Sequence, residues 1–407
     1  MAESTKFDVE VGPEYPRGFH AGGSCCGLKA SGKPDLAMIW CEGDARVFGM
    51  FTRNCVYAAP VQVCRERLER GGKFRGVVAN SGNANACTGE QGLCDAREMA
   101  SLAERATGSP EGSFLVCSTG VIGHPLDMSL LRKGIPELGT ALKEGRPTDF
   151  PYQRAIMTTD TRPKNFGLEL SFAAGKVRMA GCCKGAGMIH PDMATLLAFV
   201  TTDLELPQSF EGEFRAIVDD SFNSITVDGD TSTNDTALLF SGNGSGLAYD
   251  QLSLEEQARF REALFELFAE LAKGIVRDGE GATKFVEIRV RQAASRAQAR
   301  KLGRFVGNSK LVKTAIFGND PNWGRILSSL GSAGEAIDPA KTVIRFDDVV
   351  IFAAGEPTHP PMDALREVVG RREFSITIEL GLGDAKTDVW TCDLSYEYVK
   401  INAEYTT

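Results

Sequence analysis

The 407-residue chain is poor in histidine and lacks the motifs of the best-known hydrolases and nucleotide-binding proteins. It has four histidines, and nothing in their spacing selects a Ser-His-Asp triad. It contains no Gly-x-Ser-x-Gly element and no Gly-x-x-x-x-Gly-Lys-Ser/Thr phosphate loop. No apolar run approaches the roughly 18 residues of a membrane helix. These absences exclude the commonest serine-hydrolase and phosphate-loop chemistries.

A basic tract is also missing, and the formal net charge is −9. Nonspecific binding to nucleic acid is therefore not expected. Residues 1–8 lack the apolar core of a signal peptide and are too acidic for a typical transit peptide. We expect a cytoplasmic protein that binds neither nucleic acid nor membrane. The length allows two domains and a large core.

The eleven cysteines form no Cys-x-x-Cys motif. An odd number of dispersed cysteines is typical of reduced, mostly buried thiols in a cytosolic protein. We therefore expect no metal site and no cofactor. Cys182 and Cys183 precede the candidate site described below, where one of them could line the site without reacting.

Strands and helices alternate in both halves of the chain. Apolar and β-branched runs predict strands over 36–40, 45–51, 76–80 and 114–117, and helical spacing predicts helices over 95–106 and 126–142. Ser253 opens a capping box, followed by apolar residues at helical spacing as far as Ile275. Residues 374–380 alternate, and 389–405 are predicted to form their antiparallel partner. This order predicts a layered α/β or α+β protein.

The join between Ala194 and Thr195 is the most informative point in the chain. A glycine-bearing polar loop ends there, and residues 196–200 predict a short buried strand. A threonine at this position can be an ordinary strand residue. It can also be a nucleophile that becomes a new N-terminus when the chain cuts itself before it.

Self-cleavage would supply Thr195 with its own base. A free α-amino group has an ordinary pKa of about 7.7–8.0, close to the pH at which a general base works best. An acyl-transfer site also needs donors for the developing oxyanion, and the Thr119 hydroxyl with the Gly120 N–H could provide them. A plain turn at the end of a strand is the alternative for these two residues.

Three further polar clusters lie at 80–89, 157–161 and 226–235. The last has the Asp and Asn content of a calcium loop, but its glycine is at the wrong offset and the distal glutamate is missing. Turns stabilised by side chains that bond their own backbone are the simpler interpretation of all three.

Nine short stretches stand out along the chain, and they are NSGNANA (80–86), STGVIG (118–123), MTTDT (157–161), KGAGMIHPDMAT (184–195), TVDGDTS (226–232), DGEGATK (278–284), LVKTA (311–315), DPNWGR (320–325) and YVKINAEY (398–405). Taken together and in this order, they resemble the glutamate N-acetyltransferase family, also called ornithine acetyltransferases, of arginine biosynthesis. Each stretch is weak alone, but the ordered set is specific.

The resemblance implies a layered sandwich similar to N-terminal-nucleophile hydrolases and related to DmpA-type aminopeptidases. It implies self-cleavage between Ala194 and Thr195 into an α chain (1–194) and a β chain (195–407), assembled as an α₂β₂ heterotetramer. Thr195 is then the nucleophile, and Thr119 and Gly120 form the oxyanion hole. The implied substrate contacts, besides Thr195, are Thr158 (with Thr161 as second choice), Lys184, Glu280, Asn402 and Thr407.

The implied activity is transfer of the acetyl group from N²-acetyl-L-ornithine to L-glutamate through an acetyl-Thr195 intermediate. Some members of the family also accept acetyl-CoA and so act as N-acetylglutamate synthases, and the sequence leaves this open here. An amidohydrolase or aminopeptidase on the same scaffold is the alternative enzyme. An uncleaved small-ligand-binding protein, with Thr195 as a strand residue, is the alternative from another class.

A denaturing gel distinguishes the hypothesis of a self-processing enzyme from that of an uncleaved binding protein. Self-processing predicts two bands in place of one near 43.9 kDa. Thr195→Ala is expected to remain one band because it lacks the attacking hydroxyl, whereas Thr195→Ser keeps a hydroxyl and should retain some processing. Cleavage of Thr195→Ala at this bond would rule out the nucleophile.

Overall fold

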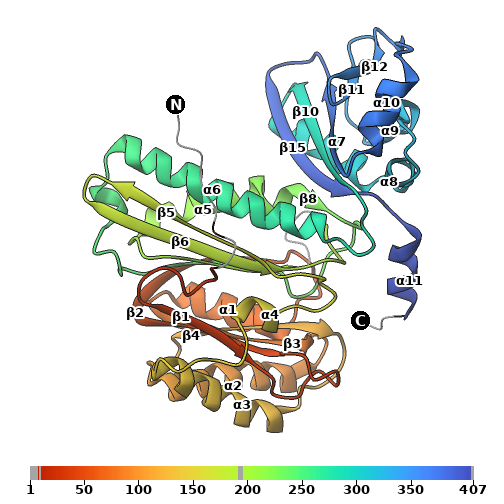
Figure 1. The fold of residues 1–407 in the computed structure, drawn as a ribbon. Helices are drawn as coiled ribbons and strands as arrows, with labels where there is room; N and C mark the ends of the chain where they lie inside the picture. The colour runs from red at the N-terminus through yellow and green to blue at the C-terminus, as the bar shows by residue number, and fades with distance from the viewer. Residues whose placement is uncertain (1–7, 9–10, 191–195, 405–407) are drawn as a thin grey trace.

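The first part of the molecule is a sandwich in which two sheet layers lie between two helix layers (Figure 1). The structure is a computed structural model that describes residues 8, 11–190 and 196–404. Eight strands build the sandwich, namely β1 (Phe19–Ser24), β2 (Leu36–Phe51), β3 (Phe74–Asn83), β4 (Phe114–Val121), β5 (Lys164–Phe172), β6 (Gly175–Lys184), β7 (Leu197–Thr202) and β9 (Thr236–Ser241). Their order is β4-β3-β2-β9-β7-β6-β5, with β1 also paired to β2.

Strand β2 belongs to both sheet layers. Its first half, from Leu36, pairs with β1 and β3, and its second half, Arg46 to Phe51, pairs with β9. The sequence predicted two strands here, over 36–40 and 45–51. The structure has one strand of 16 residues, with an irregularity between Trp40 and Ala45 where the register to β3 shifts. The exposed residues 42–44 lie at this irregularity and interrupt the apolar pattern.

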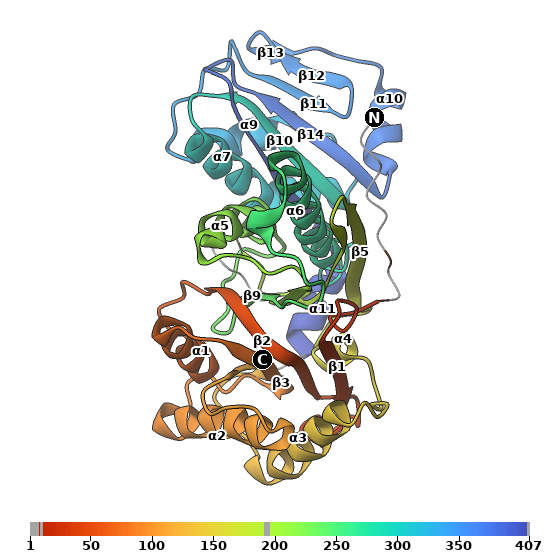
Figure 2. The ribbon, with the colours of Figure 1, turned by 90° about the vertical axis from the view of Figure 1, so that its left-hand side faces the viewer.

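Helices cover the outer face of each layer (Figures 1 and 2). The helices beside β1–β4 are α1 (Ala59–Arg70), α2 (Gly89–Thr107), α3 (Met128–Lys143) and the short α4 (Tyr152–Ala155). On the other side, α6 (Leu254–Arg277) packs on β5 and β6, and α5 (Glu211–Asp220) packs against α6 and β2. The predicted capping box is present, since the Ser253 hydroxyl accepts from Glu256 N–H at 3.3 Å. Helix α2 starts six residues before the predicted 95, because its first turn is largely exposed and shows no apolar period.

Strand β7 is buried along its whole length. Leu197 and Phe199 contribute to the apolar core on one face, and Ala198 and Val200 to the core under α6 on the other. This burial on both faces explains the continuous apolar run that the sequence showed. The predicted strand over 196–200 is therefore confirmed.

A second sheet forms the C-terminal part of the molecule (Figure 2). Its order is β13-β12-β11-β14-β10-β15-β8, with bounds β8 (Ile225–Thr226), β10 (Phe285–Ala293), β11 (Val343–Phe346), β12 (Val349–Ala353), β13 (Glu356–Pro357), β14 (Glu373–Glu379) and β15 (Ala385–Cys392). The helices of this part are α7 (Arg296–Asn308), α8 (Lys310–Phe317), α9 (Trp323–Ser332) and α10 (Met362–Gly370). The last helix, α11 (Tyr396–Glu404), reaches back toward the side of the sandwich (Figure 1).

The predicted pairing of the C-terminal strands is wrong. Strand β10 lies between β14 and β15, parallel to the former and antiparallel to the latter. Residues 396–404 form α11 instead of continuing a strand. Alternation shows which face of a strand is buried, but it does not show which strand lies beside it. The predicted layered mixture of strands and helices is confirmed.

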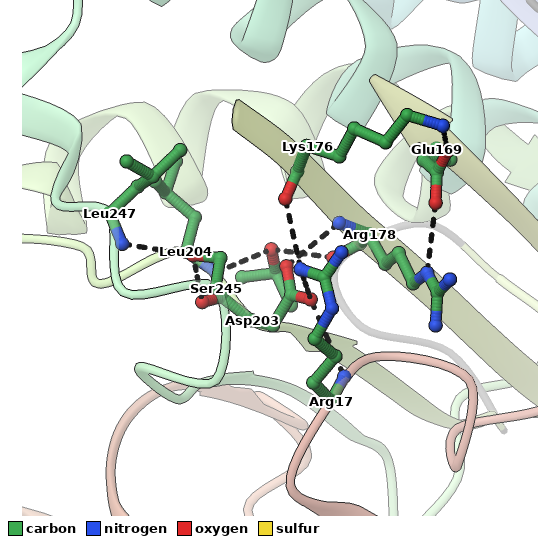
Figure 3. A network of polar contacts seen from close by, with 9 residues as sticks. Arg17, Glu169, Lys176, Arg178, Asp203, Leu204, Ser245 and Leu247 are labelled. Atoms are coloured by element: carbon green, nitrogen blue, oxygen red, sulfur yellow. Dashed lines mark hydrogen bonds and ion pairs between the residues drawn. The ribbon is translucent and has the colours of Figure 1, made fainter. Parts of the chain in front are cut away.

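A buried carboxylate connects the end of β7 to the N-terminal segment (Figure 3). Asp203 accepts from Arg178 N–H at 2.7 Å and from Arg17 Nη1 at 3.0 Å. Its own carbonyl accepts from the Ser245 hydroxyl at 2.6 Å. Arg17 also donates to the Lys176 carbonyl, so the Arg17 side chain joins its own segment to two others that are distant in sequence.

Among the described residues, no helix is long and apolar enough to cross a membrane.

Asp203→Ala is expected to lower the free energy of unfolding by about 1–3 kcal/mol. The change leaves Arg178 N–H and the Arg17 guanidinium without their acceptor in a largely buried place. The loss of stability is measured as a lower midpoint of unfolding in guanidinium chloride. Asp250→Ala, at an exposed position, is the matched control and should change stability by less than about 0.5 kcal/mol. Equal midpoints for the two variants would contradict this account of Asp203.

Candidate active site

A cavity of about 410 Å³ lies where both sheet layers, the loop before β9 and helix α11 meet. Its lining is rich in hydroxyl, amide and charged side chains, and it consists of Ala84, Thr119, Gly120, Ile122, Thr158, Thr159, Lys184, Ala186, Gly187, Met188, Asp228, Asp230, Thr231, Ser232, Thr233, Asn234, Glu280, Tyr398 and Asn402. A concave site with a few converging polar groups is where a small polar substrate is expected to bind.

The cavity brings together six of the residues that the sequence singled out. These residues come from five separate segments, and they are Thr119, Gly120, Thr158, Lys184, Glu280 and Asn402. Thr161 does not line the cavity, because its hydroxyl and N–H both donate to Asp278. Ala194, Thr195 and Thr407 lie outside the described residues.

Thr119 and Gly120 lie near the end of β4, beside β3. The sequence predicted a strand that ends at 117 with a turn after it, but pairing with β3 continues through Gly120. Gly120 has a φ of +133°, and a Cβ there would lie 2.3 Å from the carbonyl carbon of Gly82. Only glycine fits this close approach of the two backbones. The backbone at Gly120 is therefore held against β3 at the wall of the cavity.

Charges of both signs face the cavity. Lys184 ends β6, and its Nζ donates to the Thr158 hydroxyl at 3.3 Å. Burial lowers the pKa of Lys184, and Asp160 and Asp235 act against this. Glu280 accepts from Asn402 Nδ2 at 2.8 Å, which attaches α11 to the cavity wall. The site thus holds an ammonium and a carboxylate, a pair that suits an amino acid substrate.

The start of β7 lies beside this cavity. Leu197, two residues after Thr195, pairs with Lys184 in the antiparallel ladder of β6 and β7. Leu196 N–H donates to Asp235 Oδ1 at 3.0 Å. Burial raises the pKa of Asp235 well above its ordinary value. The backbone that directly follows Thr195 is therefore held next to the cavity by a buried carboxyl group.

A buried ionic cluster, which the sequence analysis did not predict, supports three parts of the site. Asp160 accepts from Lys164 Nζ at 2.5 Å, from Gly185 N–H at 2.7 Å and from Thr158 N–H at 3.0 Å. Lys164 Nζ also donates to Asp278 at 2.6 Å. One cluster therefore holds the segments that carry Thr158 and Lys184, and it reaches the turn before Glu280. The only sequence signal is the spacing of four between Asp160 and Lys164.

Two residues of the 226–235 cluster also position the site. Asp228 accepts from Met188 N–H at 2.6 Å and Ile189 N–H at 2.9 Å, and burial raises the pKa of Asp228 to about 6. Asn234 Nδ2 donates to the carbonyls of Ala84 and Ser118. The sequence interpretation of this cluster as local turns accounts for neither set of long-range bonds.

The cysteines do not take part in the cavity wall. Cys182 and Cys183 are both buried and point into the two apolar cores on opposite faces of β6, so neither lines the site. Six of the eleven thiols are buried, and all eleven are free, which agrees with the expectation of reduced cysteines. Within the described part of the chain, no group of three or more His, Cys, Asp and Glu side chains could hold a metal ion.

Comparison with known proteins gives a consistent result. A family model described as "ArgJ family" matches residues 20–407. An arginine biosynthesis bifunctional protein ArgJ from Geobacter sulfurreducens is 46% identical over 397 residues, covering 96% of this chain and 99% of that protein. A mitochondrial protein of the same name from Schizosaccharomyces japonicus is 41% identical over 418 residues, covering 100% of this chain and 96% of that protein. An ornithine acetyltransferase from Mycobacterium tuberculosis, solved in complex with ornithine, is 36% identical and covers 48% of this chain and 100% of its own, with a TM-score of 0.42.

The ionic cluster predicts a specific pH dependence. Burial alone would raise the pKa of Asp160, but Lys164, Lys184 and Gly185 N–H outweigh burial and lower the pKa to about 2 from 3.8. The stabilisation from its ionised form is therefore complete above about pH 4 and is lost as the pH falls toward 2. Asp160→Asn should be less stable than the wild type, with the difference shrinking over that range. Urea unfolding of both proteins at several pH values measures this difference in stability. A difference that does not change with pH would contradict the ionised state assigned to Asp160.

Proposed function

The chain belongs to the ArgJ family and is an acyltransferase of arginine biosynthesis, and we propose that Thr195 carries the acetyl group between its substrates. The reaction moves the acetyl group from N²-acetyl-L-ornithine to L-glutamate. The observation that supports the assignment of residues is the single cavity lined by Thr119, Gly120, Lys184 and Glu280 beside the start of β7.

In the first half-reaction, Thr195 Oγ attacks the acetyl carbonyl, and its proton passes to the Thr195 amine. The Thr119 hydroxyl and Gly120 N–H donate to the oxyanion of the tetrahedral intermediate. The C–N bond then breaks, the departing nitrogen takes the proton, and ornithine leaves. In the second half-reaction the glutamate amine attacks the acetyl ester, which releases N-acetyl-L-glutamate and restores the Thr195 hydroxyl.

The same hydroxyl creates the catalyst. Its attack on the Ala194 carbonyl forms an ester, and hydrolysis of that ester frees the Thr195 amine. The products are an α chain (1–194) and a β chain (195–407). Asp228 and Asp235 hold the described backbone on the two sides of this join, at Met188–Ile189 and at Leu196.

Substrate recognition follows from the charges of the cavity. Lys184 and Thr158 bind a substrate carboxylate, and Glu280 binds the side-chain ammonium of ornithine with help from Asn402. Thr407 completes the site from the C-terminus. The ornithine complex of the Mycobacterium tuberculosis relative agrees with a site for a small amino acid.

Acetyl-CoA is proposed as a second donor, consistent with the word "bifunctional" in the relatives' names. Thr195 Oγ would attack the thioester, the C–S bond would break, and the sulfur would take the proton held by the Thr195 amine. We also propose an α₂β₂ assembly and a cytoplasmic location. The Schizosaccharomyces japonicus relative is named as mitochondrial.

A hydrolase on the same scaffold is the rival function, in which water takes the acetyl group. Acetyl transfer to glutamate should far exceed hydrolysis of N²-acetyl-L-ornithine by the processed protein. If hydrolysis predominates at saturating glutamate, the protein is an amidohydrolase.

The oxyanion role of Thr119 is tested in the same transfer assay. Thr119→Val removes one donor to the oxyanion and should lower kcat by about 10²–10³, with KM little changed. Thr119→Ser keeps the hydroxyl and is the matched control, expected to retain most of kcat. Both variants are compared after processing is checked on a gel. A kcat for Thr119→Val within a few-fold of the wild type would exclude the role.

A further inference from the structure

A second cavity, of about 590 Å³, adjoins the acyl-transfer cavity and carries basic side chains. Its lining includes Lys29, Lys33 and Arg154 beside the apolar groups of Phe150 and Met157. We infer that this basic cavity binds the phosphate-bearing part of a nucleotide-linked acetyl donor, so that the acetyl end lies in the neighbouring acyl-transfer cavity. This inference rests on the proposed use of acetyl-CoA as a second donor.

The two cavities are joined at two points. Thr158 lines both of them. Gly82 lines the basic cavity, and its partner in the parallel ladder of β3 and β4 is Gly120, which lines the acyl-transfer cavity. A Cβ on Gly82 would lie 3.0 Å from Lys29 Cγ, so Lys29 packs against β3, the strand beside the one that carries Thr119 and Gly120. A donor bound across this boundary would pass next to Thr119 and Gly120.

The loop that carries Lys29 and Lys33 is fixed by a buried carboxylate. Asp35 accepts from Cys26 N–H at 2.7 Å, Gly27 N–H at 3.1 Å and Lys29 N–H at 2.9 Å. Lys29 Nζ donates to the carbonyls of Pro34 and Met157, at 2.8 and 2.7 Å. These bonds hold the ammonium at the boundary between the loop and the segment before Thr158. The cation is therefore preorganised and does not have to be ordered when a ligand binds.

The other two cations are available to a ligand. Lys33 and Arg154 are exposed, and neither side chain forms a hydrogen bond or an ion pair with any residue of the described chain. The one carboxylate in the lining, Asp160, is buried and is neutralised by Lys164. Burial is the largest cause that lowers the pKa of Lys29; Lys184 and Lys33 lower it further, and Asp35 and Asp160 act in the opposite direction. Positive charge is thus concentrated here in a chain whose net charge is −9.

The basic side chains of this second cavity are better suited to phosphate groups at the end of a long arm than to the amino acid substrates. Ornithine and glutamate are small, and the acyl-transfer cavity already offers Lys184 and Glu280 to their charges. The acetyl group of acetyl-CoA is separated from its phosphates by a long pantetheine arm, so the phosphates must lie outside that cavity. Arginine and lysine side chains provide charge-assisted hydrogen bonds to phosphate, and the apolar lining can contact the arm.

The test compares acetyl donors with and without phosphates. The double variant Lys33→Glu/Arg154→Glu should raise KM for acetyl-CoA by about tenfold or more, because two attractive contacts become repulsive. KM for acetyl-pantetheine, which has no phosphate, should stay within about twofold, as should KM for N²-acetyl-L-ornithine and for glutamate. Lys133→Glu, an exposed reversal on α3, is the matched control and should leave all four values unchanged.

Each other result overturns the inference. An unchanged KM for acetyl-CoA in the double variant would show that the basic cavity does not bind its phosphates. An equal rise for glutamate would assign the cavity to the acceptor carboxylates instead. A wild-type enzyme that transfers from N²-acetyl-L-ornithine but not from acetyl-CoA would overturn this inference and leave the proposed transferase intact. Failure with both donors would instead refute the proposed function itself.

Discussion

The burial of β7 on both faces is the constraint on which the rest of the structure depends. A strand that is apolar on both sides must lie between two cores, and here it lies between β6 and β9 with a core on each face. Pairing with β6 places Lys184 opposite Leu197, and pairing with β9 brings the polar loop before Thr236 to the same end. The parts of the site therefore meet at the start of this strand, two residues after Thr195.

Buried carboxylates then fix the backbone around this strand. Asp203 holds its far end against the N-terminal segment, and Asp235 holds Leu196, the residue directly before it. Asp160 and Lys164 hold the neighbouring segments that carry Thr158 and Lys184. Burying a charge is costly unless it is paired and fully hydrogen-bonded. Such groups stabilise one arrangement of the loops, because any displacement would remove hydrogen bonds from buried polar or charged groups.

The sequence predicted the parts of this structure that local pattern controls. The capping box at Ser253, the apolar stripe as far as Ile275 and the buried strand after Leu196 all follow from spacing. The ordered polar stretches identified the family, and six of the site residues predicted from them meet in one cavity. Lys164 and Asn234 were missed, because a lysine at a strand end and an asparagine in a polar loop look like ordinary surface residues in a sequence.

By itself, the sequence determined the layered class of the fold, the family and the identity of the residues around the join at Thr195. These properties depend on local periodicity and on motifs that are contiguous in the chain. Only the tertiary structure decided that β10 separates β14 from β15, and that Thr158, rather than Thr161, faces the cavity. It also decided that Asp160 and Asp278 share one lysine. Strand order and buried ion pairs join residues that are distant in the chain, and such contacts leave no period or spacing from which they can be predicted.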